Sequence, residues 1–176
     1  YRTSRNIKII KSTKRIVSTG QIEGHYYIDN VTKHYQHSVK NADLILIVLP
    51  ASIHKDIALK ILPYLTDGQI ILLNPGRTWG AIEVYNIIKM YRPKLKIHVG
   101  ETETLLFTSR KLQDYGVHIA GIKNAIEYCF YPETSNQFAR PILEPLFPQF
   151  HQVDDIRLTS LNNIGAILHP AGTILN

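Results

Sequence analysis

Two side chains near the end of the sequence, Asn162 and His169, are of types that orient substrates and transfer protons. A histidine whose pKa lies near neutrality both accepts and donates a proton at physiological pH. Because seven residues make nearly two turns of an α-helix, Asn162 would share a helix face with His169. The alternatives are a buried histidine bonded to a backbone carbonyl and an asparagine that caps the helix near Ser160. Residue types alone leave both interpretations open.

A second group of candidates lies where three expected strands end, at Pro50, at the turn Asn74-Pro75-Gly76 with Arg77 behind it, and at Glu101. In a parallel sheet, ligands bind beyond the carboxyl ends of the strands. Small and turn-forming residues there let the backbone approach a flat, extended ligand. Arg77 would offset pyrophosphate charge, and Glu101 would bind a ribose hydroxyl or a cationic amine. The alternatives are an ordinary turn, a surface arginine and a turn-capping glutamate.

The excess positive charge lies in one short segment. The formal net charge is +6, and the six basic residues that precede the first acid, Glu23, account for it. Within this segment Arg2, Ser4 and Arg5 suit the 2′-phosphate of NADP(H), if they lie in the loop after the second strand of a dinucleotide-binding unit. The alternative is a solvated flank. No Gly-x-Gly-x-x-Gly spacing occurs in the chain, so the first βα unit of such a fold is expected upstream of Tyr1.

The central part of the sequence alternates between two kinds of pattern. Apolar runs predict strands at 43–50, 69–74 and 95–101, and helical spacing predicts helices at 53–65, with Ser52 as N-cap, and at 81–91. A continuous apolar run such as 43–50 suits the interior of a parallel sheet, where both faces are covered. The order and short links indicate an α/β fold of the Rossmann type with right-handed crossovers.

After Gly100 the pattern changes to short extended pieces at 104–110 and 116–123. A helix with proline interruptions is expected at 135–147, and a further helix, capped by Thr159 or Ser160, runs to the end of the chain. We therefore expect a dinucleotide-binding domain over 1–155, truncated at its N-terminus. Residues 156–176 would form the first helix of an all-α substrate domain.

The sequence disfavours several classes of protein and of site. A single cysteine, Cys129, provides no disulfide framework and favours a reducing cytoplasm. No apolar run reaches the ~20 residues of a membrane span. His34 and His37 have no third ligand placed with them, so no metal site is expected. Nucleic-acid binding through the basic segment is disfavoured, because residues 2–15 lack aromatic side chains for base stacking.

Three stretches, taken in order, resemble the octopine/nopaline (opine) dehydrogenase family. They are NADLILIVLPASIHKDIALKILPYLTDGQIILLNPGRTWGAIE at 41–83, GETETLLFTSR at 100–110 and LTSLNNIGAILHPAGTILN at 158–176. The second is similar to the family's E-T-x-T-L-x-Y-A-C-R stretch, and the third to the L-x-x-x-L-N-N-x-x-A-x-x-H-P segment that opens its helical domain. Phe107, Thr108 and Ser109 replace Tyr-Ala-Cys, so any role tied to that cysteine is absent.

The resemblance implies a two-domain enzyme that uses NAD(P)H to reduce the imine formed between an amino acid and a 2-oxo acid, a reaction at a CH–NH bond. It implies a catalytic role for His169, together with an acidic residue beyond Asn176. NADP(H) is expected from the basic segment, with NAD(H) left open. Partners would be the small-molecule substrates, without nucleic acid or membrane, and a homodimer is left open.

One alternative keeps the fold and changes the substrate. It is an NAD(P)-dependent 2-oxo acid or 2-hydroxy acid reductase, similar to the ketopantoate or glycerol-phosphate dehydrogenase types.

Overall fold

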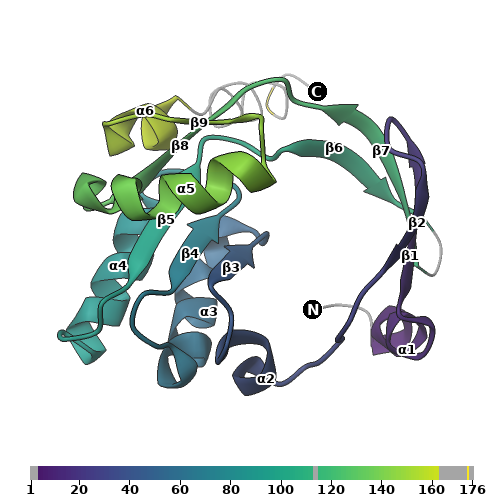
Figure 1. Cartoon of the computed structure of the whole chain (residues 1–176), viewed down its shortest axis with the longest axis horizontal. Helices are drawn as coiled ribbons and strands as arrows, with labels where there is room; N and C mark the ends of the chain where they lie inside the picture. Colours follow the sequence, from purple (N-terminus) through teal and green to yellow (C-terminus); the bar gives the residue numbers. More distant parts are fainter. Residues whose placement is uncertain (1–3, 113–114, 163–173, 175–176) are drawn as a thin grey trace.

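The computed structural model describes residues 4–112, 115–162 and 174, with two β-sheets (Figure 1). The larger sheet has the order β3-β4-β5-β8-β9. Its strands are β3 (Leu44–Ile47), β4 (Ile70–Leu73), β5 (His98–Thr102), β8 (Ile126–Tyr131) and β9 (Phe150–Gln152). The first three strands are parallel, β8 is antiparallel to β5, and β9 is parallel to β8. The predicted α/β fold of the Rossmann type is confirmed.

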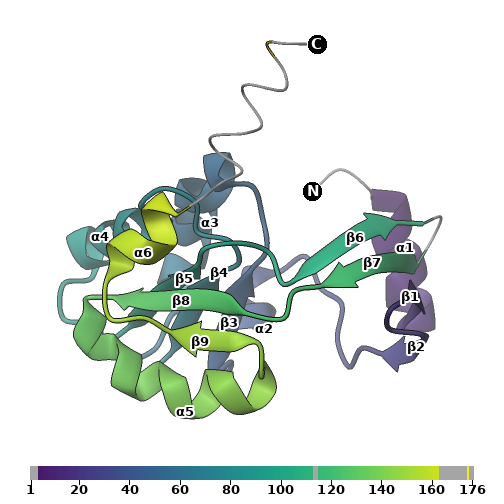
Figure 2. The same cartoon turned by 90° about the horizontal axis from the view of Figure 1, so that it is seen from above.

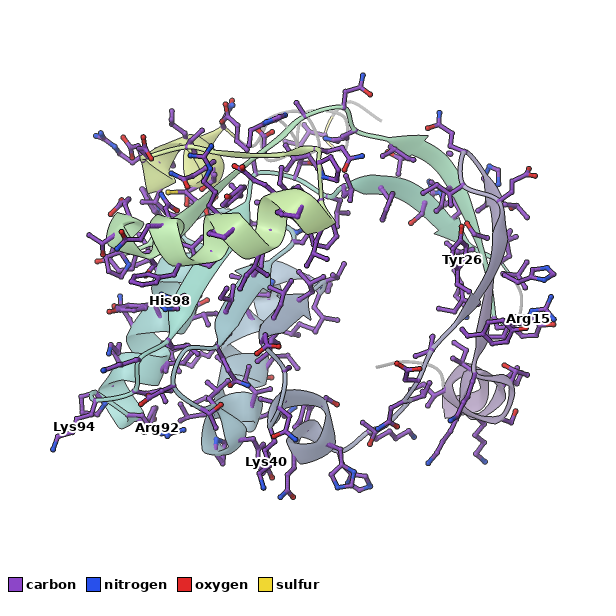
Figure 3. All side chains as sticks on the ribbon, in the orientation of Figure 1. Arg15, Tyr26, Lys40, Arg92, Lys94 and His98 are labelled. Carbon is purple, nitrogen blue, oxygen red and sulfur yellow. The ribbon has the colours of Figure 1, made fainter. Side chains whose placement is uncertain are left out.

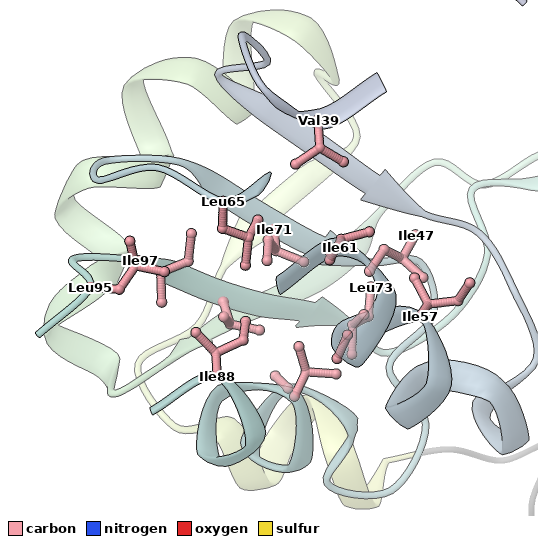
Figure 4. Close-up of a cluster of buried hydrophobic side chains, with 14 of the residues drawn as sticks. Val39, Ile47, Ile57, Ile61, Leu65, Ile71, Leu73, Ile88, Leu95 and Ile97 are labelled. Atoms are coloured by element: carbon pink, nitrogen blue, oxygen red, sulfur yellow. The ribbon is translucent and has the colours of Figure 1, made fainter. Parts of the chain in front are cut away.

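Helices cover both faces of this sheet, as Figures 1 and 2 show. On one face lie α3 (His54–Ile61) and α4 (Gly80–Tyr91), and on the other lies α5 (Asn136–Leu146). All four residues of β4 are buried, because successive side chains point to opposite faces. Ile71 and Leu73 join the core beneath α3 and α4, drawn in Figure 4, while Ile70 and Leu72 join the core around Phe130. This double burial explains why the run carries no polar residue.

Strand β3 departs from its expected place in the interior of the sheet. Within the described residues it pairs only with β4, so it is an edge strand. Leu46 is 41% exposed and Val48, just beyond the strand, is 57% exposed. The expectation that both faces and both edges of this run are covered is therefore not met within the described part of the chain.

The smaller sheet has the order β2-β1-β7-β6 and lies to one side of the larger one (Figure 2). Its strands are β1 (Arg15–Gly20), β2 (Gly24–Tyr27), β6 (Phe107–Lys111) and β7 (Gly116–Ile122). Helix α1 (Ser4–Thr13) precedes it. The expected loop at the start of the chain is thus wrong from Ser4 onward, where the backbone is helical.

The remaining elements are short. They are α2 (Tyr35–Val39), α6 (Ile156–Leu161) and the 3-10 turns Ala51–Ile53, Leu62–Tyr64 and Glu133–Ser135. No helix in the described ranges is long and apolar enough to cross a bilayer. The single cysteine, Cys129, is buried in β8, and burial raises its pKa to about 12.

Two predicted helix caps are wrong. Ser52 lies inside a 3-10 turn, and α3 begins without a side-chain cap. Helix α6 begins earlier than expected, because Asp155 caps it by accepting the Arg157 backbone N–H at 2.9 Å. Ile156 lies in the core beneath α3 and α4, so α6 packs on the larger sheet. The predicted domain boundary at residue 156 stays a prediction.

Candidate functional site

A groove of about 380 Å³ lies at the carboxyl ends of β3 and β4. Four of the predicted cofactor-binding residues line it: Pro50, Asn74, Pro75 and Arg77. The other lining residues are Val48, Leu49, Ala51 and Leu105, so the surface is mostly apolar. The parallel pairing of β3 with β4 brings their ends together, as the sequence pattern predicts.

Asn74 places an unsatisfied acceptor beside this groove. Its backbone N–H donates to the Ile47 carbonyl at 2.9 Å, which continues the β3–β4 pairing to the last residue of the run. The residue is only 7% exposed, and its side-chain Oδ1 has no hydrogen-bond partner among the described groups. Buried acceptors are normally paired, so an unpaired Oδ1 at this strand end is unusual.

The loop after Asn74 has an unusual backbone. Arg77 and Trp79 have φ values of 60° and 61°, in the left-handed region that residues with a side chain seldom adopt. Such conformations cost roughly 1–3 kcal/mol each and persist where the surroundings enforce them. Part of that enforcement is visible, since the Trp79 N–H donates to Ser160 Oγ at 3.2 Å. The loop therefore holds Arg77 at the groove in a conformation that depends on α6.

Glu101 lies at the carboxyl end of β5, fully buried, and does not line the groove. Its carboxylate accepts the Ala81 N–H at 2.8 Å and the hydroxyls of Thr159 at 3.1 Å and Ser160 at 2.5 Å. Burial raises the pKa of Glu101, and the three hydrogen bonds oppose that shift. A contact with a ribose hydroxyl or a substrate amine stays a prediction, because the described partners of this carboxylate are all protein groups.

The structure gives a packing reason for the glycines at these strand ends. A Cβ on Gly76 would lie 2.2 Å from the Cβ of Glu101, and a Cβ on Gly100 would lie 2.6 Å from the Phe130 ring. The bare turn after β4 is thus required by the Glu101 side chain packed against it. Close approach of a ligand to Gly76 remains a prediction.

His54 and Leu105 were not among the predicted residues. His54 is fully buried at the start of α3, and its Nε2 lies 3.0 Å from the carbonyl oxygen of Leu49, which lines the groove. Burial lowers the pKa of His54, so the neutral ring is favoured. The neutral ring donates to Leu49 and fixes that carbonyl. Helical spacing alone gives no signal for this contact.

The remaining predicted residues are not brought to the groove by described contacts. Ser4 and Arg5 belong to α1, and their side chains, like Arg2 and His169 as a whole, lie outside what the structure describes. Asn162 is exposed and forms the C-cap of α6, which ends at Leu161. The shared helix face of Asn162 and His169 and the 2′-phosphate contacts therefore stay predictions.

The opposite end of the larger sheet has a different character. Lys40, Arg92 and Lys94 are spread along that edge, which is the lower edge in Figure 3. Arg92 donates to the carbonyls of Leu62 at 3.1 Å and Leu65 at 2.7 Å, so this cation serves the fold. The predicted site residues that the structure describes on this sheet lie at its carboxyl end.

Comparison with known proteins gives one close sequence relative, an opine dehydrogenase from Arthrobacter sp. (strain 1C). It is 35% identical over 174 residues, which is 98% of this chain and 48% of the relative. The chain thus spans about half the length of the curated relative that it matches. No family model matches the sequence.

Solved structures share the fold at low identity. Octopine dehydrogenase with NADH and L-arginine has a TM-score of 0.74 at 17% identity, over 95% of this chain and 43% of its own. NADP+-bound yersinopine dehydrogenase has a TM-score of 0.69 at 14% identity, over 97% and 44%. A ketopantoate reductase of the PanE/ApbA family from Ralstonia eutropha JMP134 has a TM-score of 0.58 at 12% identity, over 88% and 48%. The predicted resemblance to the opine dehydrogenase family is confirmed over nearly the whole chain, and the fold is the Rossmann-like fold that these enzymes share.

Proposed function

We propose that this chain is the cofactor-binding part of an NAD(P)H-dependent oxidoreductase of the opine dehydrogenase type. The reaction would be reduction of the imine formed between an amino acid and a 2-oxo acid, at a CH–NH bond. The observation that carries the proposal is the mostly apolar groove at the ends of β3 and β4, lined by Pro50, Asn74, Pro75 and Arg77. The named relative, which covers 98% of the chain, supports the reaction class.

The residues of the groove fit a pyridine dinucleotide. Pro50, Ala51 and Pro75 offer apolar surface to a flat ring, Asn74 adds a polar residue to the lining, and Arg77 offers positive charge to a pyrophosphate. Arg2, Ser4 and Arg5 are proposed to bind a 2′-phosphate, which makes NADP(H) the expected form, with NAD(H) as the alternative. One of the structural neighbours is NADP+-bound and another is bound to NADH.

The chemistry divides between cofactor and protein. NAD(P)H, when bound, supplies a hydride. His169 is proposed to hold and transfer a proton at the reacting nitrogen or oxygen of the substrate, because imidazole titrates near neutral pH. Asn162, the C-cap of α6, would orient the substrate or the nicotinamide amide. The amino acid and 2-oxo acid are proposed as small-molecule partners in the cytoplasm.

A second candidate is a reductase that acts on a 2-oxo acid without an amine. The fold likeness to a ketopantoate reductase supports it, although that likeness carries the fold alone. The two candidates differ in whether an amino acid must be present before hydride transfer.

The test follows NADPH absorbance in the whole protein with a panel of 2-oxo acids, each with and without a panel of amino acids. The first candidate predicts oxidation that requires both reactants. Oxidation that proceeds equally well without any amino acid would support the second candidate, and absence of oxidation under every combination would contradict both. Repeating the assay with NADH measures the cofactor preference independently of the reaction class.

A further inference from the structure

The buried Glu101 carboxylate connects three segments that are far apart in the sequence. They are the end of β5, the first turn of α4 and the last turns of α6. We call the residues that meet here, Glu101, Trp79, Ala81, Thr159 and Ser160, the Glu101 junction. No lysine, arginine or histidine is among the partners that the structure describes for this carboxylate. A buried carboxylate held by hydrogen bonds and by no described cation calls for a reason beyond packing.

Helix α4 supplies part of the compensation. The residue at its N-cap is Trp79, which makes no side-chain capping bond. Glu101 takes over this role from a neighbouring strand by accepting the Ala81 N–H at 2.8 Å. The N-terminus of a helix carries about half a positive charge, so a carboxylate is favoured there. The first turn of α4 is therefore fixed by Glu101 and has no free capping position for an anion at Ala81.

Ser160 makes the junction a three-way connection. Its hydroxyl donates to Glu101 Oε1 at 2.5 Å. Ser160 Oγ also accepts the Trp79 N–H at 3.2 Å. Thr159 adds a second hydroxyl at 3.1 Å from Oε1. Both residues are fully buried, so water does not replace these bonds. One serine thus links α6 to the strand end and to the strained loop at the same time.

The Glu101 junction connects the Arg77 loop with Asn162. The loop carries Arg77, which lines the groove, in a left-handed conformation next to Trp79. Helix α6 leads to Asn162, its C-cap. A shift of α6 relative to β5 would therefore move the groove loop and Asn162 together.

We propose that Glu101 is a positioning residue, whose carboxylate holds the Arg77–Trp79 loop and α6 in one arrangement at the end of β5. The inference rests on the proposed function for its kinetic consequence, since the groove is taken as the cofactor site and the segment after α6 as the source of the proton donor. The arrangement itself is testable without any turnover.

Glu101→Gln preserves the shape of the side chain and removes its symmetry. A carboxylate accepts on both oxygens, whereas an amide accepts on one side and donates on the other. The Ala81 N–H faces Oε2, and the Ser160 and Thr159 hydroxyls face Oε1, where Thr159 also has the Ile156 carbonyl within 3.0 Å as an alternative acceptor. An amide NH2 therefore faces either the Ala81 N–H or the Ser160 hydroxyl, and the latter must turn from donor to acceptor. Ser160→Ala removes the donor to Glu101 and the acceptor of Trp79 N–H while adding no bulk. The two variants weaken the same junction by different chemistry.

Gln69→Ala is the matched control. Gln69 is 4% exposed, bonds to Val39, Ala42 and Thr66, and lies just before β4, at the opposite end of that strand from the groove. Its loss also removes buried hydrogen bonds and lowers stability, but it leaves the Glu101 junction intact. It therefore separates lost positioning from lost stability.

The first measurement is backbone hydrogen exchange in the whole protein. We expect residues 77–81 and 156–161 to exchange faster together, by about threefold or more, in both Glu101→Gln and Ser160→Ala, because each segment loses its tie to the other. Gln69→Ala should leave both segments at the wild-type rate. Faster exchange in only one of the two segments, or an equal effect in Gln69→Ala, would overturn the proposal.

The second measurement is kinetic and depends on the proposed function. With NADPH, a 2-oxo acid and an amino acid, Ser160→Ala is expected to lower kcat by about tenfold, since small misplacements of reacting groups carry large rate penalties. Gln69→Ala should keep kcat within about twofold. Unchanged kcat in both junction variants would overturn the positioning role, whereas an inactive wild-type protein would contradict the proposed function and leave the exchange result to decide on Glu101.

Discussion

Replacing Gly76 with alanine tests whether the bare turn after β4 exists to make room for Glu101. The added Cβ would lie 2.2 Å from the Cβ and 2.4 Å from Oε2 of Glu101, whereas ordinary van der Waals contact begins at 3.4 Å. The φ of Gly76 lies outside the left-handed range, so alanine at this position causes a steric clash and no backbone strain. Both contacts belong to a buried strand end, so we expect Gly76→Ala to lower the free energy of unfolding by about 3 kcal/mol, the upper end of overpacking costs.

Gly68→Ala is the control for this prediction. Gly68 has a φ of 85° and no atom within 4 Å of the position that a Cβ would take, so its substitution costs backbone strain alone, about 1 kcal/mol. Urea denaturation of the whole protein, followed by circular dichroism, compares the two variants. Wild-type stability in Gly76→Ala, combined with a loss of NADPH affinity, would refute the packing argument and indicate that the turn is bare for the ligand.

Three further predictions concern the proton donor, the 2′-phosphate site and the buried Glu101. His169→Ala should keep the NADPH dissociation constant and lower kcat by about 10²–10⁴-fold, and equal turnover would remove His169 from the reaction. Arg2→Asp should weaken NADPH binding more than NADH binding in paired titrations, and an unchanged ratio would end the 2′-phosphate argument. Because burial raises the pKa of Glu101, ionising it costs more in the folded than in the unfolded chain, and wild type should lose stability relative to Glu101→Gln as pH rises from about 4 through the raised pKa. A difference in unfolding free energy that is constant between about pH 4 and 8 would contradict that assignment.

The sequence was informative where local pattern and burial agree. The apolar run of β4 predicts a strand covered on both faces, and its four residues alternate between two cores as a central strand requires. The turn at Asn74 and Pro75 likewise predicts the groove, since parallel strands place their carboxyl ends together. These features depend on residues close in sequence or on the general geometry of α/β sheets.

Contacts between distant segments leave no signal in the local sequence pattern. Thr159 and Ser160 read as helix caps, but α6 starts at Ile156 and both hydroxyls bond to Glu101, 58 and 59 residues earlier. A glutamate at the end of a buried strand was a usable signal, because its carboxylate needs donors, yet nothing local says which donors supply them. The requirement for glycine at position 76 also comes from Glu101, which is distant in the sequence, and no turn pattern reveals it.

We propose that the cofactor lies against the ends of β3 and β4. Hydrogen exchange of the whole protein with and without NADPH reports on the groove itself and needs no substrate. We predict slower exchange at residues 48–51 and 74–77 on binding, with no change at residues 66–69, at the other end of β4. Protection confined to other segments, or no protection with NADPH demonstrably bound, would place the cofactor elsewhere.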